Sequence, residues 1–103
     1  MKESKIESYL VRRVKAIGGE VRKVKWLGRR GAPDRLVMLP QGGTAIWNNW
    51  NCSVWVELKA TGVAAEPHQL REHTRMRDLG QHVVIIDSIE GVDTLLTDPL
   101  NHA

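Results

Sequence analysis

The chain has one cysteine among its 103 residues, and it has no apolar run that approaches the ~20 residues of a membrane helix. Cys52 therefore has no partner for an intrachain disulfide, and no neighbouring Cys or His at a suitable spacing suggests zinc. Repeats and low-complexity segments are absent, and the first residues, Met1 to Ser4, are polar and charged rather than those of a secretory signal. We therefore expect a cytoplasmic protein without a membrane partner.

Length and composition predict one small folded domain over residues 1–103. Apolar residues make up 42% of the chain and charged residues 26%, which is ordinary for a soluble globular protein. The hydrophobic pattern predicts a mixed α/β order of one helix, three strands, a helix, a strand and a last helix. The expected elements are helix 4–17, strand 20–26, strands 33–39 and 53–60, a helix from Pro67 to near Gly80, strand 82–87 and a short helix capped by Ser88. Because a helix precedes strand 82–87, this strand should run parallel to its neighbour.

Basic residues are concentrated in the first third of the chain. Residues 1–35 contain eleven Lys or Arg and four Asp or Glu, whereas residues 36–103 contain four and eight. Such asymmetry focuses positive potential on one part of the surface, as in a protein that binds a polyanion. The candidates for DNA-phosphate contacts surround the loop before Asp34: Lys23, Lys25, Arg29, Arg30 and Arg35. Arg12, Arg13 and Lys15 are also compatible with a solvated helix face.

Asp34, Glu57 and Lys59 form the most informative pattern in the chain. Glu57 and Lys59 lie two positions apart, so they emerge from the same face of a strand. If strand 33–39 pairs antiparallel with strand 53–60, Asp34 lies beside both. Two carboxylates can hold Mg²⁺, and an adjacent ammonium can stabilise charge on a phosphate. A Glu-x-Lys triplet can also be a solvated ion pair, but charged residues in such apolar strands favour a site for phosphodiester hydrolysis.

Several stretches, in this order and spacing, resemble the VRR-type nuclease domain of the PD-(D/E)XK phosphodiesterase superfamily. They are Glu7 within Ser4-Lys5-Ile6-Glu7, Gly31 to Arg35, Val56 to Ala60, Gln69 in Pro67 to Leu70, and the strand Val83 to Ile86. The resemblance covers about Ile6 to Leu96. It implies an α/β fold with a restriction-endonuclease-like core, αβββαβ with a short C-terminal helix, in which helices flank a mixed sheet.

The resemblance also implies roles for individual residues. Mg²⁺ or Mn²⁺ would be held by Asp34, Glu57, the Leu58 carbonyl and Glu7. Lys59 would position or activate the attacking water, and Gln69 would contact the scissile phosphate. For Glu7 the sequence leaves a second reading open, because Ser4-x-x-Glu7 is also a capping box. Gln69 could equally be a surface residue, and His73 stands where many related nucleases carry Tyr.

Stand-alone members of this family resemble structure-specific nucleases. The implied function is a metal-dependent DNA endonuclease, a homodimer that resolves branched DNA such as four-way (Holliday) junctions. A general or defence nuclease acting on ordinary DNA is the alternative, and a non-catalytic DNA-binding module is a third reading. Trp47 and Trp50, in the connection 40–52, could stack on unpaired bases, anchor a second subunit or cover the end of the sheet.

Overall fold

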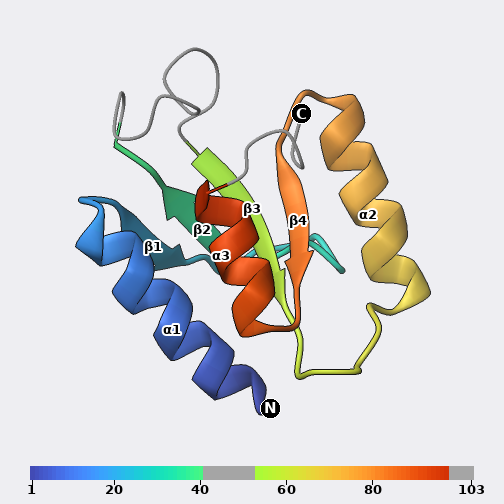
Figure 1. The fold of residues 1–103 in the computed structure, drawn as a ribbon. Coiled ribbons are helices and arrows are strands. Elements are labelled where there is room, and N and C mark those ends of the chain that lie inside the picture. The colour runs from blue at the N-terminus through green and yellow to red at the C-terminus, as the bar shows by residue number, and fades with distance from the viewer. Residues whose placement is uncertain (41–52, 98–103) are drawn as a thin grey trace.

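The computed structural model describes residues 1–40 and 53–97, and Trp47 and Trp50 lie outside them. The elements follow the predicted order (Figure 1): α1 (Glu3–Ala16), β1 (Glu20–Lys23), β2 (Arg35–Met38), β3 (Ser53–Leu58), α2 (Pro67–Asp78), β4 (Val83–Ile86) and α3 (Ile89–Thr97). The strands form one sheet in the order β1-β2-β3-β4. β1, β2 and β3 are antiparallel neighbours, and β4 runs parallel to β3. The mixed sheet and the parallel direction of β4 are therefore confirmed.

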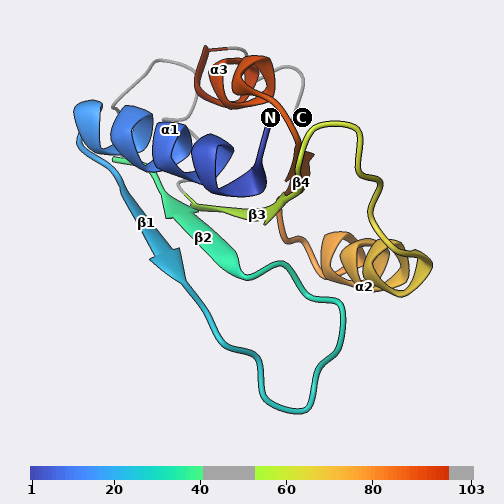
Figure 2. The ribbon, with the colours of Figure 1, turned by 90° about the horizontal axis from the view of Figure 1, so that it is seen from below.

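The helices cover the two faces of the sheet unequally. Seen edge-on, α1 and α3 lie together on one face, and α2 lies on the other side, beside β4 (Figure 2). The hydrophobic core fills the layer between α1, α3 and the sheet. Its residues are Ile6, Leu10 and Val14 of α1; Val37 of β2 and Leu39 directly after β2; Val54, Val56 and Leu58 of β3; Ile86 of β4; and Val92, Leu95 and Leu96 of α3.

The alternation of side chains along β3 decides which residues are available for chemistry. Val54, Val56 and Leu58 point into the core below α1 and α3, so Trp55, Glu57 and Lys59 belong to the opposite face. Burying an aliphatic side chain of this size is worth about 1.5–3 kcal/mol. A shift of one residue in register would expose all three core residues, which fixes Glu57 and Lys59 on the side of α2.

The helix starts correct one reading of the sequence. α1 begins at Glu3 after Lys2, with no side-chain cap, so Ser4 and Glu7 do not form a capping box. A capping box occurs instead at α2, between Glu66 and Gln69. At α3 the prediction is confirmed, because the Gly91 backbone N–H donates to Ser88 Oγ at 2.9 Å.

Candidate active site

Asp34 lies opposite Glu57 at the end of two paired strands. The register pairs Arg35 with Val56, so the preceding Asp34 falls across from Glu57. The main chain is held on both sides of this point. The Val24 N–H donates to the Asp34 carbonyl at 2.9 Å, and the Lys59 N–H donates to the Ile86 carbonyl at 3.0 Å. The predicted antiparallel pairing of β2 and β3 is confirmed, and so is the predicted position of Asp34 beside Glu57.

The Glu57 carboxyl is buried, with 8% of the residue exposed. Burial raises its pKa to about 7; the charge of Lys59 opposes the shift and that of Asp34 adds to it. Glu57 Oε1 is inaccessible to solvent and has no hydrogen-bond partner. A buried carboxylate oxygen without a donor is costly, and a cation bound there would satisfy it.

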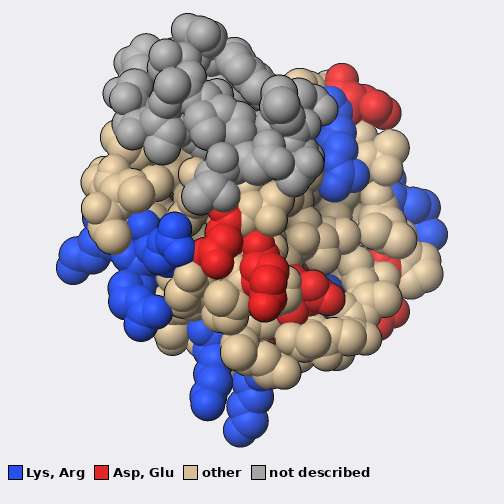
Figure 3. Space-filling model, in the orientation of Figure 1, with Lys and Arg blue, Asp and Glu red and all other residues tan. Residues whose placement is uncertain are grey.

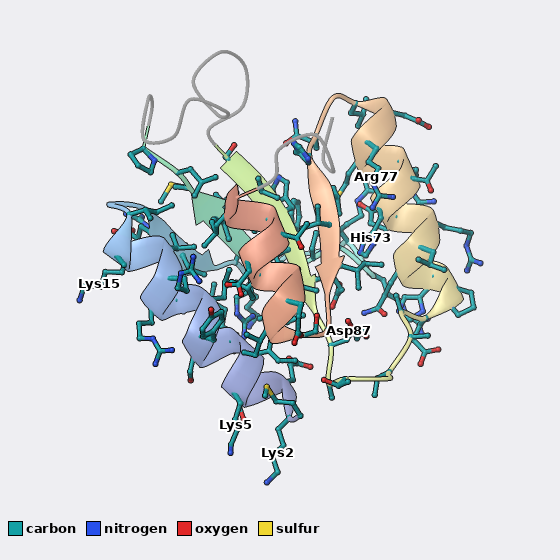
Figure 4. All side chains as sticks on the ribbon, in the orientation of Figure 1. Lys2, Lys5, Lys15, His73, Arg77 and Asp87 are labelled. Atoms are coloured by element: carbon teal, nitrogen blue, oxygen red, sulfur yellow. The ribbon has the colours of Figure 1, made fainter. Side chains whose placement is uncertain are left out.

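His73 forms the wall behind Glu57, which the sequence did not establish. It comes from α2 and is 0% exposed, with its Nε2 3.4 Å from Glu57 Oε1. Figure 4 shows His73 between α2 and the sheet. Burial lowers the pKa of His73, and the nearby Arg77 lowers it further, so the imidazole is neutral at neutral pH. Such a buried ring does not reach solvent-borne DNA; it packs against the carboxylate of Glu57.

Arg35 is buried between Glu7 and Asp34. It is 7% exposed and lies on the same face of β2 as Val37, below α1. One nitrogen of its guanidinium is 2.7 Å from Asp34 Oδ1, and the other side of the group forms an ion pair with Glu7. Burial opposes the charge of Arg35, but the hydrogen bond that Arg35 donates to Glu7 and the charges of both carboxylates raise its pKa overall. Arg35, expected to contact DNA, thus joins the carboxylate of Glu7 in α1 to that of Asp34, directly before β2.

Replacing Arg35 by Met should destabilise the protein by about 1.5–3 kcal/mol, because Glu7 and Asp34 lose charge-assisted hydrogen bonds from a buried guanidinium. Urea unfolding at pH 7 measures the change. The matched control is Arg22→Met, whose ion pair with Glu20 is exposed and should cost less than about 1 kcal/mol. Equal costs for the two variants would mean that the Glu7–Arg35–Asp34 network contributes nothing to stability.

Gln69 lies in the first turn of α2, where its side-chain oxygen accepts the Glu66 backbone N–H at 2.8 Å. The loop before Asp34 packs closely on this turn. Gly31 has a φ of 87°, and a Cβ added there would lie 2.8 Å from the His68 carbonyl oxygen. Only glycine fits this approach without strain. Gln69 is thereby placed beside the loop that carries Asp34, with its oxygen already engaged at the helix start.

The basic residues before Asp34 are divided between two environments. Lys23, Lys25 and Arg29 line a pocket of about 560 Å³ together with Val24, Trp26, Ala32 and Asp34. Arg29 also pairs at 3.5 Å with the buried Glu72 of α2, which Arg75 contacts at 2.8 Å. Arg30, the remaining predicted phosphate contact, is exposed.

The basic residues of α1 belong to a different surface. On the face formed by α1 and α3, acidic side chains gather near the centre and basic ones lie toward α1 (Figure 3). Arg13 of α1 pairs at 2.6 Å with Asp93 of α3, so it joins the two helices. This mixed charge fits the solvated-face reading of Arg12, Arg13 and Lys15 better than DNA binding.

The side chains beside Glu57 supply part of what a divalent cation needs. Among residues 1–40 and 53–97, no three or more His, Cys, Asp or Glu side chains gather in a way that could hold a metal ion. Asp34 and Glu57 nevertheless offer two carboxylates, one with a buried, unpartnered oxygen. Mg²⁺ commonly binds through one or two carboxylates and takes its other oxygens from water and phosphate. The residues present therefore fit such an ion.

The fold is a small α/β domain of the restriction-endonuclease type. Helices α1, α2 and α3 surround a mixed four-stranded sheet, and Asp34 and Glu57 lie at the ends of adjacent strands. No family model matches the chain. It is 44% identical over 88 residues, 85% of each chain, to "Putative nuclease p44" of Acyrthosiphon pisum secondary endosymbiont phage 1. A solved structure of a VRR_NUC domain superposes with a TM-score of 0.78 and 39% identity, covering 95% of this chain and 97% of the other. The chain belongs to the VRR-type nuclease family, as its motifs indicated.

In the part of the chain that the structure describes, none of the helices has the length and apolar character required to cross a membrane.

Proposed function

We propose that this nuclease-family protein is a divalent-metal-dependent DNA endonuclease that acts as a homodimer on branched DNA such as four-way junctions. The catalytic part of this proposal rests on the environment of Glu57. Its buried Oε1 has no donor, Asp34 lies opposite, and Lys59 follows on the same face of the strand. A buried carboxyl whose pKa is raised to about 7 is the kind of group that gathers at functional sites.

The proposed cation is Mg²⁺ or Mn²⁺, held by Asp34, Glu57 and the Leu58 carbonyl. Glu7, whose carboxylate pairs with Arg35, would exchange this partner for the cation and complete the site from α1. Such an ion would act as a Lewis acid and neutralise negative charge on the scissile phosphate. Asp34 and Glu57 would otherwise repel both each other and the DNA backbone.

Lys59 is the residue that we assign to the reacting phosphate and the attacking water. Its charge is close enough to Glu57 to lower the pKa of that carboxyl, which supports this assignment. The ammonium would hold the water in line or stabilise the charge that develops on the phosphate oxygens. Gln69, at the start of α2, would contact the same phosphate.

The proposed dimer follows from size and symmetry. One 103-residue protomer has little surface with which to grip several duplex arms. Two sites related by a two-fold axis could nick opposed strands of a two-fold symmetric junction. A general or defence nuclease on ordinary DNA is the competing function, and a non-catalytic binding module is a further one.

A panel of labelled linear, flapped and four-way DNA separates these functions. The protein and its Glu57→Gln variant are incubated with each DNA in Mg²⁺, Mn²⁺ or EDTA. We expect metal-dependent paired nicks in junction strands of like polarity, giving duplexes that a ligase seals. Scattered cuts at equal rates on linear duplex would favour the general nuclease. Binding without cleavage in either metal would favour the binding module.

Removing Lys23 and Lys25 should weaken DNA binding and reduce its salt dependence. Each lysine that contacts a phosphate contributes about one to the slope of log affinity against log salt concentration. The double variant Lys23→Ala/Lys25→Ala is compared with Lys5→Ala/Lys15→Ala, which removes the same charge from α1 (Figure 4). Fluorescence anisotropy over a salt series measures both. Equal losses in the two variants would show that only net charge matters.

A further inference from the structure

The pocket beside Asp34 combines an apolar lining with basic residues. Val24, Trp26 and Ala32 supply the apolar part, and Lys23, Lys25 and Arg29 supply the cations. The proposed phosphate contacts explain the cations but not the exposed part of a tryptophan. A phosphate backbone needs charge and hydrogen-bond donors, whereas an aromatic surface suits the face of a base.

Trp26 is held rigidly in place. Its indole N–H donates to the Pro33 carbonyl at 2.9 Å, directly before Asp34. Its ring also packs against Trp55 of β3, with the centroids 5.1 Å apart and the planes inclined by 49°. Because the ring is fixed before a ligand arrives, little conformational entropy would be lost on stacking.

The opposite end of the loop is fixed on α2. Gly31 approaches the His68 carbonyl too closely for any side chain, and Arg29 reaches Glu72. Figure 2 shows this loop, between β1 and β2, extending away from the sheet on the side of α2. The pocket is thus a preformed feature of the loop, and Asp34 lies among its lining residues.

We propose that this pocket binds an unpaired nucleotide next to the scissile phosphate, with its base against Trp26 and its flanking phosphates on Lys23 and Lys25. The volume of about 560 Å³ is within the range of pockets for small organic ligands. In a continuous duplex both faces of a base are covered by its neighbours, so only an unstacked nucleotide can enter. The site therefore favours DNA in which a nucleotide can unstack, at the strand crossing of a four-way junction or at the branch of a flap. This inference rests on the proposed DNA nuclease function and specifies its substrate.

Binding is tested without cleavage, in EDTA, on three labelled DNAs: a flapped duplex, oligo(dT) and a linear duplex of the same length as the flapped one. Trp26→Leu should weaken binding to the first two by about 5- to 100-fold, the loss of one base–aromatic contact, and leave linear duplex binding unchanged. Trp26→Phe keeps a ring and should recover much of the affinity. Leu27→Ala, at the adjacent and highly exposed position, is the control and should change nothing.

Ala32→Leu provides a test that leaves Trp26 intact. The larger side chain fills the pocket and should produce the same selective loss. In parallel, 2-aminopurine at the flap nucleotide nearest the branch reports stacking, and its fluorescence should be quenched by the wild type and not by Trp26→Leu. Equal weakening on all three DNAs, or unchanged binding in both pocket variants, would overturn the proposal.

Cleavage assays in Mg²⁺ or Mn²⁺ keep this inference separable from the nuclease proposal. If the wild type cleaves DNA but Trp26→Leu retains the preference for flapped over linear DNA, the pocket proposal alone fails. If the wild type quenches 2-aminopurine but cleaves no DNA with either metal, the nuclease proposal fails and the nucleotide site stands.

Discussion

Glu57→Gln should abolish cleavage and, in the absence of metal, make the protein more stable than the wild type at pH 8. The folded pKa of Glu57 is about 7, above its ordinary 4.5, because the carboxyl is buried. The folded state therefore favours the protonated form. Stability from this group is fully present below pH 4.5, falls as the pH rises to about 7, and is lost at pH 8. This shift in the pKa of Glu57 corresponds to about 3 kcal/mol of folding free energy. The neutral amide of the Glu57→Gln variant should restore that stability at pH 8.

Urea unfolding in EDTA at pH 5 and pH 8 measures this effect. The wild type should lose stability relative to Glu57→Gln between these two pH values, and Glu90→Gln, an exposed carboxyl on α3, should follow the wild type. Adding Mg²⁺ should stabilise the wild type and not Glu57→Gln. The same pH dependence in Glu57→Gln and wild type would show that this carboxyl does not titrate near pH 7.

A cation at Glu57 has to compete with the proton. We therefore expect the affinity for Mg²⁺ or Mn²⁺ to rise with pH through about 7. Asp34→Asn should lower this affinity and abolish turnover while DNA binding in EDTA persists or tightens, because one negative charge facing the phosphate is removed. Undiminished cleavage by Asp34→Asn would exclude this residue from the site.

Lys59→Ala should lower kcat by about 100- to 1000-fold while KM changes little, the magnitude typical of a lost electrostatic contact to the transition state. The ammonium would interact most strongly with the phosphate when charge builds up during in-line attack. Single-turnover cleavage gives the rate constant, and anisotropy in EDTA gives the affinity for the same DNA.

Lys23→Ala is the matched control for Lys59→Ala, since it removes the same charge from the pocket rim and should lower affinity more than rate. If Lys59→Ala behaved like this control, with weaker binding and a smaller salt dependence, Lys59 would be a phosphate clamp rather than part of the chemistry.

The sequence by itself determined the order of the elements and the position of Asp34 beside Glu57. The first follows from hydrophobic periodicity, and the second from the two-residue repeat of a strand with the antiparallel pairing of β2 and β3. β1 is shorter than the hydrophobic pattern predicts, because it ends at Lys23 and not at Trp26. After the hydrogen bond from the Val24 N–H to the Asp34 carbonyl the chain turns away from β2, and Trp26 packs against Trp55 and donates to the Pro33 carbonyl.

Only the tertiary structure decided what surrounds the two carboxylates. Arg35 lies between Glu7, 28 positions earlier in the sequence, and the adjacent Asp34. Helix α1 packs over β2 and thereby brings Glu7 to Arg35. His73 lies behind Glu57 because α2 packs on the far face of the sheet. Such contacts depend on how helices dock on the sheet, and no local pattern of residues specifies that geometry. The sequence located the two acids by strand register, while helix docking set the burial and the raised pKa of Glu57 and brought Arg35 and His73 to the two carboxylates.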